Sequence, residues 1–302
     1  MAEDLMSHPL ASARSWLFVP ANRPERYAKA LASGADAVIV DLEDAIAPAD
    51  KLLARQTLVH AIDNLTTAHR ARLLVRINAS GTPWQTDDLV ALRGVMAKGL
   101  AALMVPKAES PHTLAQVAGV VGPTCTLVPL IESVAGLDAV NALAACPQVL
   151  RLAFGHLDFQ ADTGMSCDAH EAELVPVRLA LVFASRRAGL AAPVDGISPD
   201  THDTARLTLE TMRSRRGGFA GKLCIHPAQV ASINAAFSPS AAELEWAERV
   251  QAAFDAAGGG VFSLDGRMVD APVLLLARRT LTQAATYGLV NGPVNSLVGS
   301  QS

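Results

Sequence analysis

The sequence predicts an α/β fold: a closed (β/α)8 barrel followed by a C-terminal helical extension. Eight short apolar or β-branched runs alternate with longer helix-like stretches between residues 14 and about 236, as a closed parallel barrel requires. Half of the residues are hydrophobic and the mean hydropathy is +0.26, which favours strands covered by helices. The main alternative, an open doubly wound sheet, usually has a glycine-rich turn after its first strand. Here residues 19–24 read VPANRP instead.

The expected strands and helices follow from this alternation. Strands are expected over residues 16–20, 37–42, 73–78, 102–107, 126–132, 151–154, 193–197 and 222–226. Helices are expected over residues 23–32, 49–65, 85–98, 111–121, 134–145, 171–188, 199–215 and 227–236.

A separate block follows the eighth unit. Ser240 is expected to cap a helix over residues 241–257, with Glu243 at the N3 position, and three glycines end it. A polar segment then leads to a last helix from residue 272 to about 287. We therefore expect a flexible N-terminus over 1–13, a barrel over 14–237, a helical extension over 238–287 and a flexible tail over 288–302.

Composition disfavours several classes of partner. A formal net charge of −4 and an aromatic content of 4% indicate no surface for nucleic acid or anionic lipid. The four cysteines lie far apart with no Cys-x-x-Cys pair, so neither zinc nor disulfides are expected. No apolar run reaches membrane-spanning length and no secretory signal is evident, so the expected location is the cytoplasm.

Polar residues interrupt the expected strands at their carboxyl ends, where barrel enzymes have their active sites. After the second strand, alternation places Asp41 and Glu43 on the same side, and two carboxylates there suit proton abstraction or charge control. The alternative is an acidic cluster that caps the next helix or pairs with Lys51 and Arg55. For the pair of acids we favour a functional role.

Basic residues end the next two strands. Arg76 lies within an apolar run, where an unpaired guanidinium would be costly to bury, so it needs a carboxylate from the protein or from a ligand. Its planar fork suits two-point binding of a ligand carboxylate, which we favour over an internal ion pair. Lys107 presents the same two alternatives.

The fifth and sixth strands each lead to an acid, Glu132 and Asp158. Two carboxylates at neighbouring strand ends, without cysteine, form a small oxygen-ligand site of the kind that Mg²⁺ prefers. His156 lies nearby, but a lone histidine is more often structural than a ligand, so we leave it out of the site.

Taken together, these segments resemble the citrate lyase β-subunit family, within the HpcH/HpaI aldolase group that includes malyl-CoA and citramalyl-CoA lyases. The resemblance covers roughly residues 14–285, and its motifs are specific in combination rather than singly. They are 14–20 (RSWLFVP), 34–45 (GADAVIVDLEDA), 51–55 (KxxxR), 75–78 (VRIN), 105–107 (VPK), 131–132 (IE), 154–158 (FGxxD), 221–229 (GKLCIHPAQ) and 265–270 (DGRMVD).

The resemblance implies a TIM-type barrel that binds Mg²⁺ and a coenzyme A or acyl-carrier thioester, and that assembles as a homotrimer or a dimer of trimers. It implies that Glu132 and Asp158 hold the metal, with Glu132 also facing the substrate. Arg76 would bind the carboxylate of an oxoacid such as oxaloacetate, glyoxylate or pyruvate.

The remaining roles that the resemblance implies concern the thioester and the proton. Asp41 and Glu43 would line the thioester side, and Asp270 would reach a neighbouring subunit's site as acid and base. Arg14, together with Lys29 or Lys222, would meet the coenzyme phosphates. Ala21 stands where the family often has glycine, which removes access to positive φ and adds a methyl group near the thioester.

The implied reaction is Mg²⁺-dependent cleavage or formation of a 3-hydroxy-3-carboxyacyl thioester, such as malyl-CoA, citramalyl-CoA or a citryl thioester. One alternative is a thioesterase that uses the same metal site. Another is a lyase that acts on an acyl-carrier protein within a multi-subunit complex. A third is a non-catalytic barrel that binds a CoA metabolite.

Overall fold

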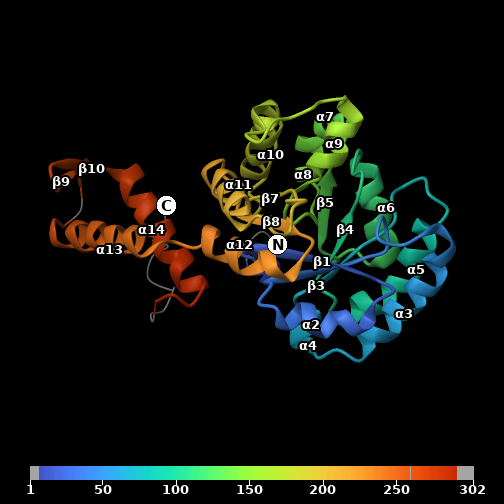
Figure 1. The fold of residues 1–302 in the computed structure, drawn as a ribbon. Coiled ribbons are helices and arrows are strands. Elements are labelled where there is room, and N and C mark those ends of the chain that lie inside the picture. Colours follow the sequence, from blue (N-terminus) through green and yellow to red (C-terminus); the bar gives the residue numbers. More distant parts are fainter. Residues whose placement is uncertain (1–6, 259, 291–302) are drawn as a thin grey trace. The chain divides into compact units, whose positions relative to one another are not determined.

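The computed structural model describes residues 7–258 and 260–290, and within them a closed barrel of eight parallel strands forms the centre of the chain (Figure 1). Each strand pairs with the next in sequence, and β8 pairs back with β1. The strands are β1 (Ser15–Pro20), β2 (Ala37–Asp41), β3 (Leu73–Arg76), β4 (Ala102–Val105), β5 (Leu127–Ile131), β6 (Ala153–Phe154), β7 (Val194–Asp195) and β8 (Gly221–Cys224). The predicted fold class is confirmed.

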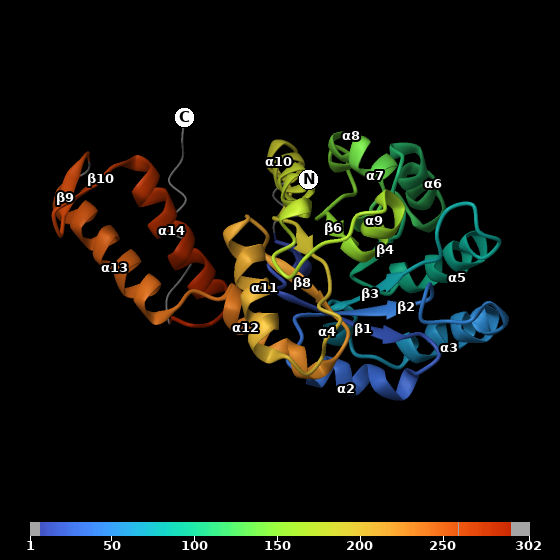
Figure 2. The ribbon, with the colours of Figure 1, turned by 45° about the horizontal axis from the view of Figure 1, so that its top comes forward.

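Helices surround this barrel (Figure 2). They are α2 (Tyr27–Ala32), α3 (Lys51–Asp63), α4 (Thr67–Arg70), α5 (Gln85–Ala97), α6 (Pro111–Val121), α7 (Val134–Asp138), α8 (Val140–Ala144), α9 (His156–Thr163), α10 (Val175–Arg187), α11 (Thr204–Arg216) and α12 (Val230–Phe237). Alternate strand residues fill the barrel with large side chains, among them Trp16, Ile39, Met104 and Leu223. The interior is therefore a packed core, and ligands must bind at an end of the barrel.

All eight predicted strands exist, and all but β1 stop short of the expected range at one or both ends. The polar residues that were placed on strand ends, such as Asn78, Lys107 and Glu132, lie just beyond the strands. The predicted helix over 134–145 is two short helices that meet at Ala139, whose φ of −84° and ψ of −3° depart from regular helix geometry. Asp41 and Arg76 are the last residues of β2 and β3, whereas Asn78, Lys107 and Glu132 lie on loops that follow their strands at the barrel mouth.

Two helices were not predicted. In α9 only His156 and Phe159 are buried, so the sequence carries no apolar periodicity to reveal it. Helix α4 has four residues, too few for any periodic signal. The missed α9 matters for function because Asp158 lies in its first turn.

The chain ends fall partly outside the described residues. Residues 1–6 and 291–302, which belong to the segments predicted to be flexible, are not described. Residues 9–11 form a 3-10 helix, η1 (Pro9–Ala11), whose Leu10 is fully buried in the barrel core. The flexible segment predicted over 1–13 is therefore wrong for this part.

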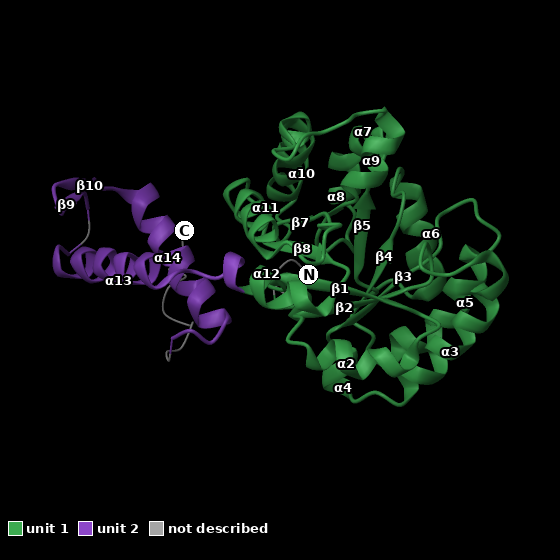
Figure 3. Ribbon diagram, in the orientation of Figure 1, with its two compact units in different colours: residues 1–234 green, residues 235–302 purple. Residues whose placement is uncertain are grey.

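The chain divides into two compact units, residues 1–234 and 235–302 (Figure 3). In the second unit, α13 (Ala241–Ala256) begins with the predicted capping box, in which Ser240 and Glu243 each accept a backbone N–H bond from the other. A last helix, α14 (Ala271–Thr286), packs against α13 around a small apolar core.

The polar segment between these helices contains two short strands that were not predicted. Strands β9 (Phe262–Leu264) and β10 (Arg267–Val269) form an antiparallel hairpin. Its two-residue turn has positive φ at both Asp265 (53°) and Gly266 (74°), the geometry of a type I′ turn. An Asp-Gly pair is a strong signal for this turn, so the sequence did contain the information.

Among the described residues, no helix has both the length and the apolar character needed to cross a bilayer. The four cysteines are all unpaired.

Candidate active site

A cavity of about 460 Å³ opens at the carboxyl end of the barrel. Its lining comes from the ends of β1, β2, β3, β5 and β6 and from residues that follow β7 and β8. Four of the predicted site residues, Asp41, Arg76, Glu132 and Asp158, line it together. Parallel strands place their carboxyl ends at one rim, so acids far apart in sequence meet there.

Arg76 is held by carboxylates of the protein. Its Nε and Nη2 donate to the two oxygens of Asp41, each at 2.7 Å, and this pair lies between neighbouring residues of β2 and β3. Its Nη1 lies 3.0 Å from Glu43 Oε2 and 3.2 Å from Asp44 Oδ2. The internal ion pair that we ranked second is thus present. Lys51 and Arg55, which the alternative paired with these acids, bond to other groups.

The charge of Arg76 is strongly stabilised. Burial opposes it, but Asp41, with help from Glu43 and Asp44, outweighs burial and raises the pKa of Arg76. Both Asp41 oxygens also accept backbone N–H bonds, from Glu43 and Ala45. Every hydrogen bond that the Asp41 carboxylate accepts thus comes from the protein, and two of these bonds orient the Arg76 guanidinium.

Glu43 is 9% exposed and is not among the residues that line the cavity. Its Oε2 has no hydrogen-bond partner among the described residues, although Arg76 Nη1 is close, so the ion pair lacks hydrogen-bond alignment. Burial raises the pKa of Glu43 to about 8, with Arg76 opposing the rise and Asp44 adding to it. Burial thus disfavours the charged form of Glu43, and the Arg76 guanidinium beside it opposes this effect.

The loop after β2 rests on a second buried network. Lys51 Nζ donates to the carbonyls of Leu42 and Glu43 and to Asn78 Oδ1. Asn78 in turn donates to Asp88, which also accepts from Arg55. The motif over 51–55 thus holds the β2 and β3 loops together rather than reacting.

Glu132, directly after β5, is fixed by main-chain geometry. Its Oε1 accepts the backbone N–H of Lys107 at 2.7 Å, and Lys107 has a positive φ of 45°, rare for a residue with a side chain. A Cβ on Gly155 would lie 2.6 Å from Glu132 Oε2, so only glycine fits there. Burial raises the pKa of Glu132 to about 7, with the Lys107 N–H opposing and Asp158 adding to the rise.

These contacts allow the fit of a divalent cation to be judged. Glu132 Oε2 has no hydrogen-bond or ion-pair partner among the described residues, and Asp158 lies close enough to raise the pKa of Glu132. No group of three or more His, Cys, Asp or Glu side chains suited to a metal occurs in the part of the chain that the structure describes. Two carboxylates that leave the other positions to water and substrate fit Mg²⁺ better than zinc.

The assignments for the coenzyme phosphates need correction for two of the three basic residues. Arg14 precedes β1, at the amino end of the barrel, and its side chain pairs with Asp36 at 2.7 Å. Lys222 is 2% exposed and donates to the Gly196 carbonyl, and burial lowers its pKa, opposed by Asp195. The amino end of the strands is opposite the cavity, so Arg14 lies at the wrong end and Lys222 is enclosed.

Lys29 lies near the mouth. It lines a cavity of about 440 Å³ together with Arg26 and His226. This second cavity shares Phe18, Val19, Pro20 and Ile225 with the first, so the two adjoin.

Ala21 and Asp270 are the two remaining residues that the sequence singled out. Ala21 is fully buried and is not among the described residues with positive φ, so alanine causes no backbone strain there. Asp270 is the N-cap of α14, where its Oδ1 accepts the Val273 N–H at 3.2 Å. It lies in the second unit, and its placement relative to a site remains a prediction.

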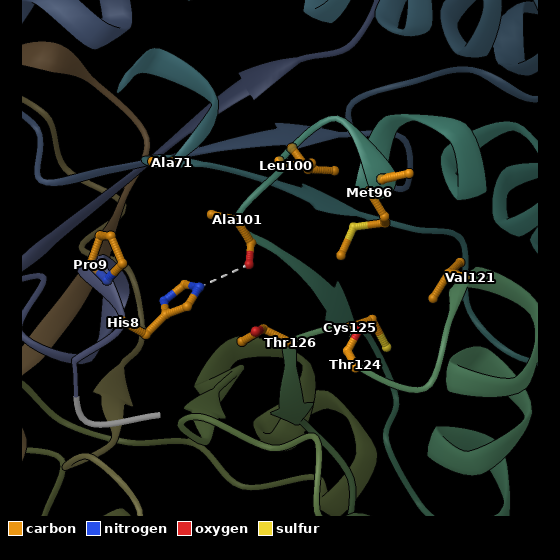
Figure 4. A pocket seen from close by; sticks show the side chains of 12 residues that line it. His8, Pro9, Ala71, Met96, Leu100, Ala101, Val121, Thr124, Cys125 and Thr126 are labelled. Carbon is orange, nitrogen blue, oxygen red and sulfur yellow. Dashed lines mark hydrogen bonds between the residues drawn. The ribbon is translucent and has the colours of Figure 1, made fainter. Parts of the chain in front are cut away.

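A cavity of about 410 Å³ lies at the opposite, amino end of β4 and β5 (Figure 4). Both ring nitrogens of His8 are used there, one with the Ala101 carbonyl and one with the Leu10 N–H. Burial raises the pKa of Cys125 to about 11, so this thiol is protonated and unreactive at neutral pH. The groups suited to chemistry are at the other end.

The chain is similar to several known proteins. The family described as HpcH/HpaI aldolase/citrate lyase matches residues 14–227, and that described as a C–C bond lyase of the TIM-barrel fold matches residues 177–289. A (3S)-malyl-CoA thioesterase of Cereibacter sphaeroides is 35% identical over 289 residues, which cover 92% of this chain and 97% of that protein.

Two similarities involve Mycobacterium tuberculosis. Its citrate lyase subunit beta-like protein is 36% identical over 279 residues, covering 91% of this chain and 96% of that protein. A crystal structure of its protein CitE in complex with magnesium, acetoacetate and coenzyme A superposes with a TM-score of 0.78 at 35% identity. It covers 91% of this chain and 99% of that chain.

Proposed function

The chain belongs to the HpcH/HpaI aldolase/citrate lyase family and is a carbon–carbon lyase, and we propose that it acts with Mg²⁺ on a 3-hydroxy-3-carboxyacyl thioester. Malyl-CoA, citramalyl-CoA and a citryl thioester are the candidate substrates. The observation that carries the proposal is the convergence of Glu132, Asp158 and Arg76 on one cavity. Magnesium and coenzyme A in the similar CitE complex support both ligands.

Glu132 and Asp158 would hold the cation. Glu132 keeps one oxygen on the Lys107 N–H and offers the other, so the carboxylate is oriented before any ligand arrives. When bound, Mg²⁺ supplies Lewis-acid polarisation of the hydroxyl and carboxylate oxygens of the substrate. Such pre-orientation of a ligand is how protein metal sites gain affinity.

Arg76 would hold the carboxylate of the oxoacid fragment. Its Nε and Nη2 are committed to Asp41, whereas its Nη1 lies 3.0 Å from Glu43 Oε2 and 3.2 Å from Asp44, whose side chain is 70% exposed. The contact with a carboxylate so exposed contributes little, so a substrate carboxylate can replace Asp44 at Nη1. We assign to Asp41 the orientation of Arg76, and to Glu43 a further contact with Nη1 of the same guanidinium.

The reaction is a retro-aldol or retro-Claisen cleavage. A base removes the hydroxyl proton, and the O–H electron pair forms the carbonyl of the oxoacid. The electrons of the broken C–C bond pass to the α-carbon of the thioester as an enolate, which then takes a proton. We propose that Asp270 of a neighbouring subunit moves this proton, a role typically worth about 10²–10⁴-fold in rate.

The adjoining cavity beside β1 suits the coenzyme. Arg26, Lys29 and His226 give it cationic or hydrogen-bonding groups without a broad positive field. We propose that Lys29 meets the coenzyme phosphates there. We also propose a homotrimer or a dimer of trimers, with residues 238–287 completing a neighbouring site, and a cytoplasmic location.

A product assay tests the proposal. Protein with Mg²⁺ is mixed with malyl-CoA or citramalyl-CoA, and oxoacid and free coenzyme A are measured separately. We expect oxoacid with one equivalent of acyl-CoA. Glu132→Gln should lower kcat/KM by at least about 100-fold, since even outer partners of a metal are worth about 10–100-fold in affinity. The matched control is Glu173→Gln, an exposed acid outside the site.

The alternatives give different products. Free coenzyme A without oxoacid would identify a thioesterase, which the name of the similar Cereibacter sphaeroides protein makes the second candidate. Turnover only with an acyl-carrier thioester would indicate a subunit of a larger lyase. Mg²⁺-independent binding without turnover would indicate a non-catalytic barrel, and undiminished activity of Glu132→Gln would reject the mechanism.

A further inference from the structure

The carboxylate of Asp158 has no support of its own. Its side chain is exposed, and no hydrogen bond or ion pair of it occurs within residues 7–258 and 260–290. The helix that carries it, α9, begins at His156 without a side-chain cap, because its N-cap is Gly155. The position of Asp158 therefore depends on whatever fixes the first turn of α9.

His156 is the residue that anchors this turn. Its side chain is only 3% exposed although it begins a helix at the barrel mouth. The ring packs so closely on Gly196, after β7, that a Cβ there would overlap its Nδ1. It also lies 6.2 Å from the Phe154 ring between centroids, and its Nε2 is 3.8 Å from Glu171 Oε1.

Glu171 lies beside the His156 ring and is itself held by two arginines. It follows α9 in the chain and has φ of 50° and ψ of 43°, a left-handed conformation that costs energy for a residue with a side chain. Its Oε2 accepts from Arg178 Nη2 at 2.6 Å and from Arg213 Nη2 at 2.7 Å. Contacts from two helices, α10 and α11, thus hold a strained residue against the His156 ring.

Arg178 connects Glu171 to the barrel wall. Its Nε lies 3.1 Å from both oxygens of Asp195 on β7, and its guanidinium lies 5.6 Å from the Phe154 ring on β6. Asp195 is fully buried and accepts the N–H of Gly196, the residue on which His156 packs. The cluster of Glu171, Arg178 and Asp195 therefore contacts His156 in two ways: directly through Glu171, and through Gly196, whose N–H bonds to Asp195.

We propose that Glu171 is a positioning residue for the metal site: through His156 it sets the first turn of α9, so that Asp158 faces Glu132. The inference rests on the proposed function, because it takes Glu132 and Asp158 as the Mg²⁺ ligands. The strain at Glu171 is maintained by two arginines, and strained residues that are held in this way tend to occur at functional sites. Outer residues that orient a metal ligand typically change metal affinity by about 10–100-fold when replaced.

The test measures Mg²⁺ binding without substrate. Glu171→Gln keeps the shape of the side chain but removes the charge that holds Arg178 and Arg213, and Glu173→Gln is the matched control two residues away. By titration calorimetry we expect Glu171→Gln to weaken Mg²⁺ binding by about tenfold. Glu171→Gln should also lower kcat, and a high Mg²⁺ concentration should restore it. Thermal unfolding in EDTA shows whether the variant is folded.

If Glu171 has a purely structural role, Glu171→Gln should lower the unfolding temperature but keep the Kd for Mg²⁺ within about twofold of the wild-type value. That result overturns the inference. If Glu171→Gln does not fold, Arg213→Gln decides, because Arg213 is partly exposed and supplies only one arm. It should weaken Mg²⁺ binding by about threefold, and an unchanged Kd contradicts the inference. If Asp158→Ala and Glu132→Ala bind Mg²⁺ normally, the proposed metal site itself is wrong, which is a separate failure.

Discussion

Gly155 packs so closely against Glu132 that a side chain at position 155 would have to move the carboxylate. A methyl group at Gly155 would lie 2.6 Å from Glu132 Oε2 and 2.7 Å from its Cβ. We expect Gly155→Ala to turn the carboxylate away and to weaken Mg²⁺ binding by about 10–100-fold, the range typical of misoriented ligands. Calorimetric titration of the folded variant checks this.

The matched control is Gly94→Ala. Gly94 lies in α5, where an added Cβ meets nothing within 4 Å. This change should stabilise the fold by about 0.5–1 kcal/mol and leave Mg²⁺ binding unchanged. Normal Mg²⁺ affinity in Gly155→Ala would show that Glu132 is not oriented in this way.

The Asp41–Arg76 pair gives a second prediction at this scale. Arg76→Met leaves Asp41 buried at 2% exposure without its charge partner, which should lower the free energy of unfolding by about 3–5 kcal/mol. Asp41→Leu together with Arg76→Met should recover most of that loss, because both charges are then gone. Urea unfolding of the two variants measures it, and equal losses would contradict the pairing.

The residue types at the expected strand ends were enough to single out Asp41, Arg76, Glu132 and Asp158. A polar side chain at the end of an apolar strand needs either a partner in the protein or a ligand. Their partners could not be predicted. The bond from Lys107 N–H to Glu132 depends on a positive φ of 45°, and nothing in the type of residue 107 indicates it. Arg76 meets Asp41 through the register of β2 and β3, which a single sequence does not contain.

At the scale of elements, β7 carries a buried acid whose charge depends on pH. Burial alone would raise the pKa of Asp195, but Arg178, Lys222, Ser214 and the Gly196 N–H outweigh it and hold it at about 2. Because this is below the ordinary value of 3.8, the charged form stabilises the fold above about pH 4. That contribution, roughly 2 kcal/mol, is lost as the pH falls toward 2.

Asp195→Asn should therefore flatten the decline of stability with acid. Urea unfolding at pH 5, 4 and 3 should give a shallower fall in unfolding free energy than in the wild type. Asp63→Asn is the control, since Asp63 pairs with Lys98 in solvent, and its slope should match the wild type. A wild-type slope in Asp195→Asn would show that Asp195 is not the acid that titrates.

Sequence periodicity located the elements with large buried faces and missed those without them. All eight strands were found because each is an apolar run, whereas α9 buries only His156 and Phe159. The β9–β10 hairpin was missed although its Asp-Gly turn is a clear signal, because the flanking strands are only three residues long and partly exposed. For this hairpin the Asp-Gly turn is a stronger sequence signal than the hydrophobic pattern of the strands.

At the scale of the molecule, the proposal that Asp270 serves a neighbouring subunit can be tested by mixing. Glu132→Ala and Asp270→Ala should each be inactive alone. In trimers that contain both variants, one site in three would combine an intact Glu132 with an intact Asp270; in mixed dimers of trimers about a quarter of the sites would, and activity should return to that extent. Differently tagged subunits, purified in sequence after co-expression, supply the mixed oligomers.

Activity that stays absent in oligomers shown to contain both tags would mean that Asp270 acts within its own chain or not at all. The sequence resemblance alone suggested this exchange. The structure describes α14 and its N-cap Asp270 in a unit separate from the barrel, which is compatible with either arrangement.

The most direct measurement is a crystal structure with Mn²⁺ in place of Mg²⁺, in which anomalous scattering locates the ion. The account predicts one strong peak at the barrel mouth, within ligand distance of a carboxylate oxygen of both Glu132 and Asp158. A peak bound by other residues, or none while both acids are ordered, would contradict it.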